Sequence, residues 1–368
     1  MQAIQHYGFY FVSFVIALGA LVAFHEFGHF WVARRSGVKV LKFSIGFGPK
    51  LMGRQVGETE YVVSAIPLGG YVKMLGEDLS DPEVSEEDKT RSFAHAPLLK
   101  RIAIVAAGPV FNLLLAYVIF TAWLATGAPL FVPTFADLTS NVETVVPGSA
   151  AEAGGVRSGD RIVQIGDKRI ATWQEMTDII KHSPGAPLKI VVERTGRTET
   201  LTVTPTPRKE KLADGTEVEV GQMGITKANK AVVRSDNVLM APIDGLDATW
   251  GWIKLTVVGI AKMITREISA DNIGGPLTIA KISGDAASQG VSNYLFLIAI
   301  LSINLGVLNL LPIPILDGGH LLFFAIEAIK RQPLSIRSRE VAQQVGLVLL
   351  IGLMLFAFRN DIVNLWLK

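Results

Sequence analysis

Two histidines and a glutamate lie together in one apolar segment, in the order His25-Glu26-x-x-His29. Residues four apart lie on one face of an α-helix, about 5–6 Å from each other, so both imidazoles can reach one Zn²⁺. Glu26 can take the proton of a water that the metal activates. The alternative is that these groups lie solvated at a membrane edge. Ionisable groups are costly in an apolar segment, which favours a functional site.

A zinc ion that activates water needs a third protein ligand. The segment "NLLPIPILDGGH" supplies two candidates, Asp317 and His320, just after two prolines that end an apolar run. We favour Asp317, because Gly318 and Gly319 leave space for a metal beside it. His320 is the alternative ligand, although we favour for it the role of a helix cap or of a partner that orients a ligand. The chain has no cysteine, so a thiolate zinc site is excluded.

Asn309 precedes Asp317 by about two helical turns. An amide inside the bilayer can bind a substrate carbonyl or a developing oxyanion. It can equally hold neighbouring helices together. We regard Asn309 as a candidate substrate-binding residue.

Hydrophobic helices must position these groups. The 368 residues are 49% hydrophobic and 18% charged, below the roughly one quarter charged that is usual for soluble domains. A membrane-spanning helix needs roughly 20 apolar residues. Four runs meet that length, and they cover residues 7–33, 102–136, 286–316 and 341–358. A cleaved signal peptide fits the first run poorly, because no basic residue precedes it. We predict four transmembrane helices.

The distribution of Lys and Arg predicts the orientation. Both the loop after the first span and the loop before the fourth are rich in them, so both should be cytoplasmic. The two termini and the long block between the second and third spans then lie outside. The first and third spans run in the same direction, which brings His25 and Asp317 to the same, cytoplasmic side of the bilayer.

The polar blocks carry further structure. Lys39–Phe47 and Glu60–Met74 alternate apolar and polar residues, which predicts a β-hairpin beside the membrane. Residues 142–204 show a strand–helix–strand–helix–strand order, and "PGSAAEAGGVRSGDRIVQIGDKRI" resembles the bacterial type of PDZ domain. A small β-rich module without that role is the alternative. Residues 243–268 favour a helix lying in the outer interface, with a soluble core helix as the alternative.

The predicted fold class is thus a polytopic α-helical membrane protein with four transmembrane helices, a membrane-associated β-hairpin region and an inserted α+β PDZ-like domain. We expect the first transmembrane helix at 1–34, the cytoplasmic β region at 35–98 and the second transmembrane helix at 99–130. The PDZ-like domain is expected at 131–208, and linker strands with the interfacial helix at 209–285. The third transmembrane helix is expected at 286–328, and the cytoplasmic loop with the fourth helix at 329–368.

Together, the HExxH segment, "AAGPVFN" in the second span, the PDZ-like insert and "NLLPIPILDGGH" resemble the site-2 protease family of intramembrane zinc metalloproteases. "GFGP", "IPLGGYVKM" and "GGPLTIAK" are similar to its bacterial sigma-E-regulating branch. The resemblance covers essentially the whole chain. Tandem PDZ domains occur in that branch, whereas one is recognisable here.

The resemblance implies a zinc metalloendopeptidase of a bacterial inner membrane, with a role in stress response. His25, His29 and Asp317 would bind Zn²⁺, Glu26 would act as base, and Asn309 would bind substrate. It implies single-span membrane protein substrates of the anti-sigma factor type, and signal-peptide remnants. The PDZ-like domain would bind a peptide or the periplasmic segment of a substrate. The net charge of +2 gives no reason to expect a nucleic-acid partner.

A substrate helix must unwind before its backbone can be attacked, and unwound backbone in lipid needs new hydrogen-bond partners. We expect the edge from Ile66 to Met74 to supply them by strand addition. The candidate substrate-binding residues on this edge are Ile66, Leu68, Gly69, Gly70 and Tyr71.

Two other classes would also place ionisable residues in spans. A transporter predicts an internal duplication, and none is recognisable in the sequence. An inactive scaffold that presents the PDZ-like domain would tolerate loss of Glu26.

Overall fold

Among the residues that the structure describes, four helices are long and apolar enough to cross a membrane, as predicted. They cover Tyr7–Arg35, Leu98–Ala125, Val291–Asn309 and Ile336–Val363. The computed structural model describes residues 2–77, 84–132, 140–211, 217–227, 231–235, 237–265, 270 and 273–366. The second apolar run continues to Ala136, and its transmembrane helix was expected to end at residue 130. Its helix ends at Ala125 instead, because Gly127 turns the chain with a positive φ of 77° and strand β3 (Leu130–Val132) follows.

The chain divides into two units, one formed by residues 1–127, 236–249 and 271–368, the other by residues 128–235 and 250–270. The first unit contains the helices α1 (Gln2–Arg35), α2 (Leu98–Ala125), α6 (Pro276–Ser288), α7 (Val291–Asn309), α8 (Asp317–Lys330) and α9 (Ile336–Trp366), the 3-10 turn Lys89–Arg91, and the strands β1 (Val40–Val56) and β2 (Thr59–Met74). Helix α5 (Ala241–Ile264) contributes residues to both units.

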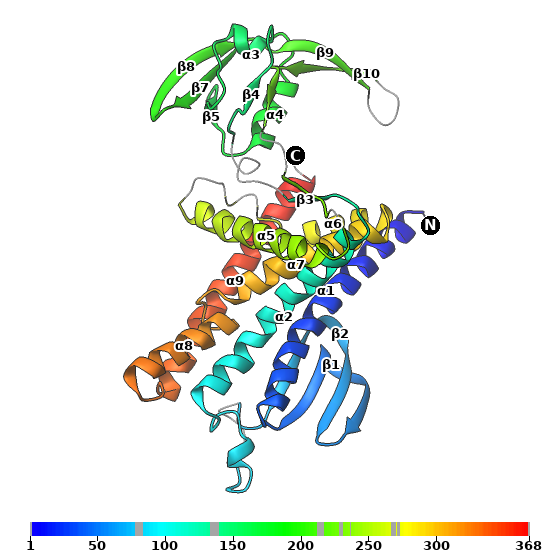
Figure 1. Cartoon of the computed structure of the whole chain (residues 1–368), viewed down its shortest axis with the longest axis vertical. Helices are drawn as coiled ribbons and strands as arrows, with labels where there is room; N and C mark the ends of the chain where they lie inside the picture. Colours follow the sequence, from blue (N-terminus) through cyan, green and yellow to red (C-terminus); the bar gives the residue numbers. More distant parts are fainter. Residues whose placement is uncertain are drawn as a thin grey trace. The chain divides into compact units, whose positions relative to one another are not determined.

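Helix α2 packs against both α1 and α7, and Figure 1 shows the three helices running side by side. Small residues permit the close approach that helices in lipid need. A Cβ at Gly28 would overlap the backbone of Ala107, and one at Gly306 would lie 3.0 Å from the carbonyl oxygen of Pro109. The Ser302 hydroxyl donates to the carbonyl of Asn112 over 2.7 Å, which ties α7 to α2.

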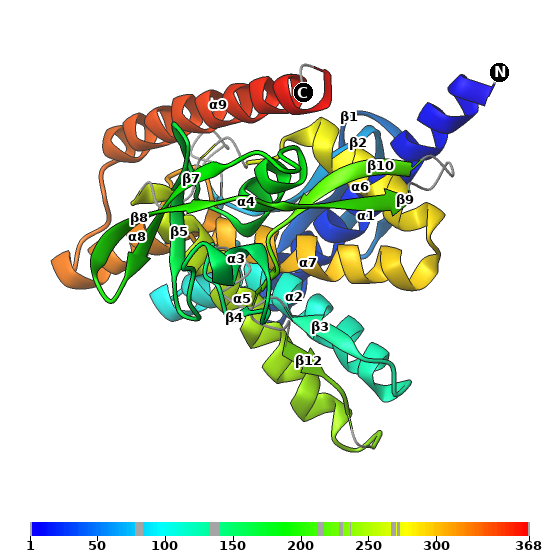
Figure 2. The same cartoon turned by 90° about the horizontal axis from the view of Figure 1, so that it is seen from above.

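A buried carboxylate holds α9 against the start of α6. Asp361 accepts hydrogen bonds from the backbone N–H groups of Gly275 (2.7 Å) and Leu277 (2.8 Å), and from both the N–H and the hydroxyl of Thr278. These are the N–H groups that the first turn of a helix leaves without intrahelical partners. Seen from above, α9 lies at one edge of the helical unit (Figure 2).

The third apolar run is not one continuous helix. Gly290, with a φ of 114°, separates α6 from α7, and α7 ends at Asn309. Residues 310–316, which include the two prolines, form the turn that the sequence predicted. Helix α8 then starts at Asp317. The break places a carboxylate at the first position of a new helix.

Strands β1 and β2 bend so that they build a wider sheet than a simple hairpin. Phe43, in the first half of β1, lies opposite both Tyr61 and Val72 of β2. The first half of β1 is therefore central, and the end of β2 from Gly70 to Met74 forms an edge next to α1. A buried core that includes Phe30 and Ile104 joins the sheet to α1 and α2.

The second unit has the predicted order of strands and helices. Its elements are β3 (Leu130–Val132), β4 (Thr144–Val145), α3 (Ala150–Ala153), β5 (Arg161–Ile165), β6 (Lys168–Arg169), α4 (Trp173–Lys181), β7 (Leu188–Arg194), β8 (Arg197–Val203), β9 (Thr206–Lys211), β10 (Glu217–Gln222), β11 (Ile225–Thr226) and β12 (Ala231–Val233). The main sheet has the order β6-β5-β7-β8. Strand β4 pairs with β11, so residues after 208 complete this unit.

Candidate metal centre

Three metal-binding side chains from two distant segments converge in the first unit. His25 and His29 lie one turn apart on α1, and Asp317 begins α8. Their ligand atoms all lie within 4.8 Å of one another. Nε2 of His25 is 3.2 Å from Nε2 of His29 and 3.1 Å from Oδ2 of Asp317, and Nε2 of His29 is 3.6 Å from Oδ1 of Asp317. His25 and His29 are only 8% and 9% exposed.

These spacings match a tetrahedral zinc site. Bonds of 2.0–2.1 Å to a tetrahedral ion place neighbouring ligand atoms about 3.3–3.4 Å apart. The Nε2 atoms of His25 and His29 are 3.2 Å apart, close to that value, and they lie 3.1 and 3.6 Å from different oxygens of the Asp317 carboxylate. Two histidines and one carboxylate are also a donor set found in catalytic zinc sites. Oδ2 of Asp317 is buried without a hydrogen-bond partner among the described residues, as expected for an atom that a cation would satisfy.

Helix α2 supplies the wall behind the two histidines, which the sequence did not reveal. Gly108 faces both rings: a Cβ there would lie 2.8 Å from Cε1 of His25 and 2.6 Å from Cε1 of His29. The carbonyl of Ile104 is 2.8 Å from Nδ1 of His29. This hydrogen bond requires the proton of His29 on Nδ1 and leaves Nε2 free for a metal. The glycine inside "AAGPVFN" was the available signal.

Asn112 lies one turn beyond Gly108 on the same face of α2. Its amide nitrogen is 3.1 Å from Nδ1 of His25. Asn112 is fully buried, and its amide oxygen has no hydrogen-bond partner among the described residues. Ile104, Gly108 and Asn112 thus form a stripe, four residues apart, against the two histidines of α1.

The glycines after Asp317 have a different purpose from the expected one. A Cβ at Gly318 would overlap the carbonyls of Leu310 and Leu311, and one at Gly319 would lie 2.4 Å from Cα of Pro314. They allow α8 to pack on the turn that precedes it, rather than making space for a metal. His320 packs edge-on against Phe323 and is not in the group of converging ligands.

A buried ion pair fixes α8, and with it Asp317. The guanidinium of Arg101 at the start of α2 donates to both carboxylate oxygens of Glu327 on α8, at 3.1 and 2.5 Å. Arg101 also donates to the carbonyl of Ala96 and lies over the ring of Phe324. Such bidentate pairs constrain geometry as well as contribute energy. Helix α2 therefore positions all three candidate ligands.

Glu26 lies between the ligand cluster and the sheet edge. The Cβ that Gly70 lacks would be 3.1 Å from Cγ of Glu26 and 2.7 Å from the carbonyl oxygen of Ser44. The backbone of Val72 is close enough to the Glu26 carboxylate to interact with it electrostatically. This end of β2 therefore lies next to the candidate base.

The other residues expected on this edge are partly accessible. Ile66 is 48% exposed. Gly69 has a φ of 146°, and a side chain there would overlap the ring of Phe47, which stacks on Tyr71 at 6.2 Å. The edge therefore requires glycine at position 69 for both conformation and space. The side chain of Leu68 lies outside the described part of the structure.

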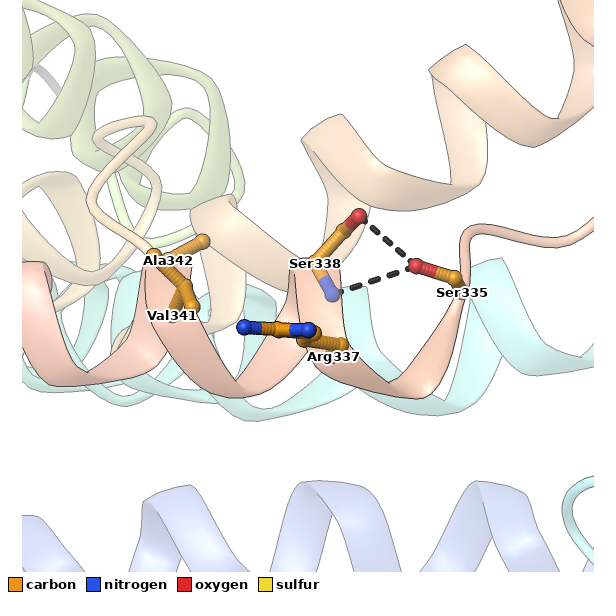
Figure 3. A pocket seen from close by; sticks show the side chains of 5 residues that line it. All are labelled: Ser335, Arg337, Ser338, Val341 and Ala342. Atoms are coloured by element: carbon orange, nitrogen blue, oxygen red, sulfur yellow. Dashed lines mark hydrogen bonds between the residues drawn. The ribbon is translucent and has the colours of Figure 1, made fainter.

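Asn309 forms the last residue of α7, half-buried, at the start of the turn that leads to Asp317. A cavity of about 480 Å³ lies elsewhere, at the start of α9. Figure 3 shows it lined by Ser335, Arg337, Ser338, Val341 and Ala342, with the Ser335 hydroxyl accepting from the backbone of Ser338. None of these side chains is a common zinc ligand, so the cavity is separate from the candidate metal centre.

In the second unit, an ion pair stabilises the main sheet. Arg194 donates to both carboxylate oxygens of Asp160, at 2.7 Å each, and the side chain of Asp160 is 1% exposed. Burial raises the pKa of Asp160, but the hydrogen bonds and charge of Arg194 outweigh it and hold the pKa below its ordinary range.

Comparisons with known proteins place this chain among zinc metalloproteases. The sequence model of peptidase family M50 matches residues 13–353. A protein of Agrobacterium fabrum that carries the name zinc metalloprotease is 38% identical over 371 residues, covering 97% of this chain and 96% of that protein. The regulator of sigma-E protease RseP of Escherichia coli is 34% identical over 451 residues, covering 96% of this chain and 98% of RseP.

The lengths of these alignments differ. Those with RseP of Escherichia coli and of Salmonella typhimurium extend over 451 and 446 positions, well beyond the 368 residues of this chain. The Agrobacterium protein aligns over 371. The RseP proteins therefore contain inserted residues that this chain lacks, enough for one small domain.

Proposed function

Because the chain belongs to peptidase family M50, the site-2 type of zinc metalloprotease, we propose that His25, His29 and Asp317 hold its Zn²⁺ and that Glu26 is its catalytic base. The protein is then an intramembrane endopeptidase, which hydrolyses a peptide bond within the transmembrane segment of a single-span membrane protein. The observation that carries the proposal is the convergence of one ligand atom from each of the three residues to within 4.8 Å of one another, from segments almost 290 residues apart.

When bound, the zinc ion polarises the scissile carbonyl and makes water a nucleophile near neutral pH. The residues of the chain supply the rest. Glu26 takes the proton of the attacking water and can pass it to the leaving amine. The apolar environment strengthens these charge interactions. Asn309 is available to donate a hydrogen bond to the substrate backbone.

The edge of β2 is suited to hold an unwound substrate. The stretch Gly70–Met74 pairs with β1 on one side, and its other side faces Glu26. A substrate strand added there would gain backbone hydrogen bonds that the lipid cannot provide. Ile66, which is exposed, and Tyr71, which is half-buried, would then contact its side chains.

We further propose that the substrates are single-span proteins of the anti-sigma factor type, with signal-peptide remnants as a second group. The name of the RseP relatives refers to regulation of sigma-E, which supports a role in stress response. The basic loops favour a multi-pass protein of a bacterial inner membrane with its site near the cytoplasmic side. Both termini and the PDZ-like unit would be periplasmic.

The second unit supports the proposal of one PDZ-like domain. Its strand and helix order is that of the bacterial type, and β11 pairs with β4 so that the segment after residue 208 belongs to the domain. We infer that it binds a peptide or the periplasmic segment of a substrate by strand addition.

Zinc content tests the ligand assignment. We expect the purified Asp317→Ala protein to lose its zinc, because the cluster loses a ligand, and the His320→Ala protein to retain about one zinc per chain. Both changes lie in α8, so the second is a matched control for folding. Zinc retained by Asp317→Ala, or lost from His320→Ala, would contradict the assignment.

Crosslinking tests the substrate edge. A photoreactive amino acid at Tyr71 should crosslink to a single-span test substrate trapped on an inactive Glu26→Gln enzyme. The same group at Tyr61, which packs against the buried core that joins the sheet to α1 and α2, should not. Equal crosslinking at both positions would argue against strand addition at this edge.

A further inference from the structure

We propose that Asn112 is a positioning residue for the metal centre, whose amide oxygen accepts the proton on Nδ1 of His25 and so directs the other ring nitrogen to zinc. The inference rests on the zinc site proposed above and concerns how α2 prepares it. The observation behind it is the 3.1 Å contact between the Asn112 amide and Nδ1 of His25.

The tautomer of His25 decides whether it can bind a metal. Nε2 of His25 faces Asp317 and His29, so this nitrogen must be the ligand atom. A neutral imidazole that binds through Nε2 carries its proton on Nδ1 and needs an acceptor there. An amide NH₂ group at that position would instead force the proton onto Nε2 and block the site. Only the oxygen of Asn112 is compatible with zinc.

The buried surroundings of Asn112 permit this orientation. A half-turn of the amide exchanges its oxygen and nitrogen, which have nearly the same shape. In the orientation with nitrogen towards His25, the oxygen has no partner among the described residues. No other side-chain hydrogen bond therefore opposes the half-turn, and the proton on His25 determines which end of the amide faces the ring.

The neighbouring histidine, His29, also has a hydrogen-bond acceptor at its Nδ1. Nδ1 of His29 lies 2.8 Å from the carbonyl of Ile104, an atom that can only accept. Ile104 and Asn112 stand eight residues apart on one face of α2, with Gly108 between them making room for the rings. The two histidines are four residues apart on α1, which runs alongside α2. One helix thus offers an acceptor to each histidine.

Asn112 is also held in place by its backbone. The hydroxyl of Ser302 on α7 donates to its carbonyl over 2.7 Å, and the residue is fully buried. The hydrogen bond to Ser302 does not involve the side chain, which gives a control that leaves the contact with His25 intact.

Zinc affinity, measured on the full chain in detergent by competition with a chelator of known affinity, tests the inference. Loss of an outer partner of a metal-binding histidine typically weakens metal affinity about 10- to 100-fold. We expect that loss for Asn112→Leu, which has a similar size and no acceptor. Asn112→Asp, which can only accept, should bind zinc within about threefold of the wild type or more tightly. Ser302→Ala should also stay within about threefold.

Each result decides the question. Wild-type affinity in Asn112→Leu would overturn the inference, as would an equal loss in Asn112→Asp, because a carboxylate cannot donate to the ring. If Asn112→Leu does not fold, the zinc affinity of Asn112→Asp alone decides. An affinity near that of the wild type means that the Asn112 amide accepts from His25, and a large loss means that it donates. If the wild-type chain binds no zinc, the proposed site itself fails, which is a distinct outcome.

Discussion

Gly108 gives the sharpest test of how α2 shapes the metal centre. Replacing it with alanine adds one methyl group directly against both histidine rings. The new Cβ would lie 2.6 Å from Cε1 of His29 and 2.8 Å from Cε1 of His25. Carbon atoms in contact are normally about 3.5–4.0 Å apart. The rings or the helix must therefore move by about 1 Å.

A shift of that size exceeds what the site tolerates. Metal and catalytic groups must stay within about 0.5 Å of their productive positions. Overpacking of a well-packed interior typically costs about 1–3 kcal/mol. If that cost is relieved by moving the histidines, zinc affinity falls by about 5- to 150-fold, since each 1.4 kcal/mol is a factor of ten.

The assay is the chelator competition on purified Gly108→Ala protein, together with cleavage of a single-span test substrate. Gly19→Ala is the matched control, because Gly19 also lies in a membrane helix and a Cβ there meets nothing within 4 Å. We expect the control to bind zinc as the wild type does. Wild-type zinc affinity and cleavage in Gly108→Ala would refute the close packing of α2 on the histidines.

Three further predictions concern the framework. Asp361→Ala should lower the free energy of unfolding by at least about 2 kcal/mol in a thermal or denaturant assay, because it leaves the buried N–H groups at the start of α6 without acceptors. An unchanged midpoint of unfolding would contradict the role of Asp361 in holding α9 against α6. Glu327→Ala should destabilise the protein more than the double change of Arg101→Met with Glu327→Leu, because the single change leaves a buried charge unpaired; the reverse order would refute this. The ion pair of Asp160 with Arg194 stabilises the folded state at pH values above the ordinary carboxyl pKa of about 3.9. This stabilisation is lost as the pH falls through the lowered pKa of Asp160. Hydrogen exchange of β5 and β7, corrected for intrinsic rates, should therefore quicken in acid for the wild type, and less so for Asp160→Asn.

The elements with strong local signals were predictable from the sequence. Four apolar runs predicted four spans, because the length and charge of a membrane helix are tightly constrained. The helix break before Asp317 was predictable from Pro312 and Pro314. In the second unit, β5, β7 and α4 appear at the positions that their patterns predicted.

The parts that depend on long-range packing were not predictable. The stripe of Ile104, Gly108 and Asn112 is apolar or neutral and has no local signature of a metal site. Its role arises only when α2 lies against the HExxH helix. The purpose of Gly318 and Gly319 was misjudged for the same reason, because their contacts are with a turn whose path the sequence does not specify.

The second transmembrane helix was expected to end at residue 130 and ends at Ala125, since hydropathy alone does not register the turn at Gly127. Uncharged residues such as those from Leu130 to Val132 suit a strand as well as a span. Where composition permits both a strand and a membrane span, only the pairing of β3 with β12 shows that the segment is a strand.

The central claim is that Glu26 performs proton transfer at a zinc centre built by His25, His29 and Asp317. The most direct test compares the wild type with Glu26→Gln for zinc content and for cleavage of a single-span test substrate in the same preparation. We predict that Glu26→Gln keeps about one zinc per chain and loses cleavage by at least about 100-fold. Cleavage at the wild-type rate by Glu26→Gln would contradict the account.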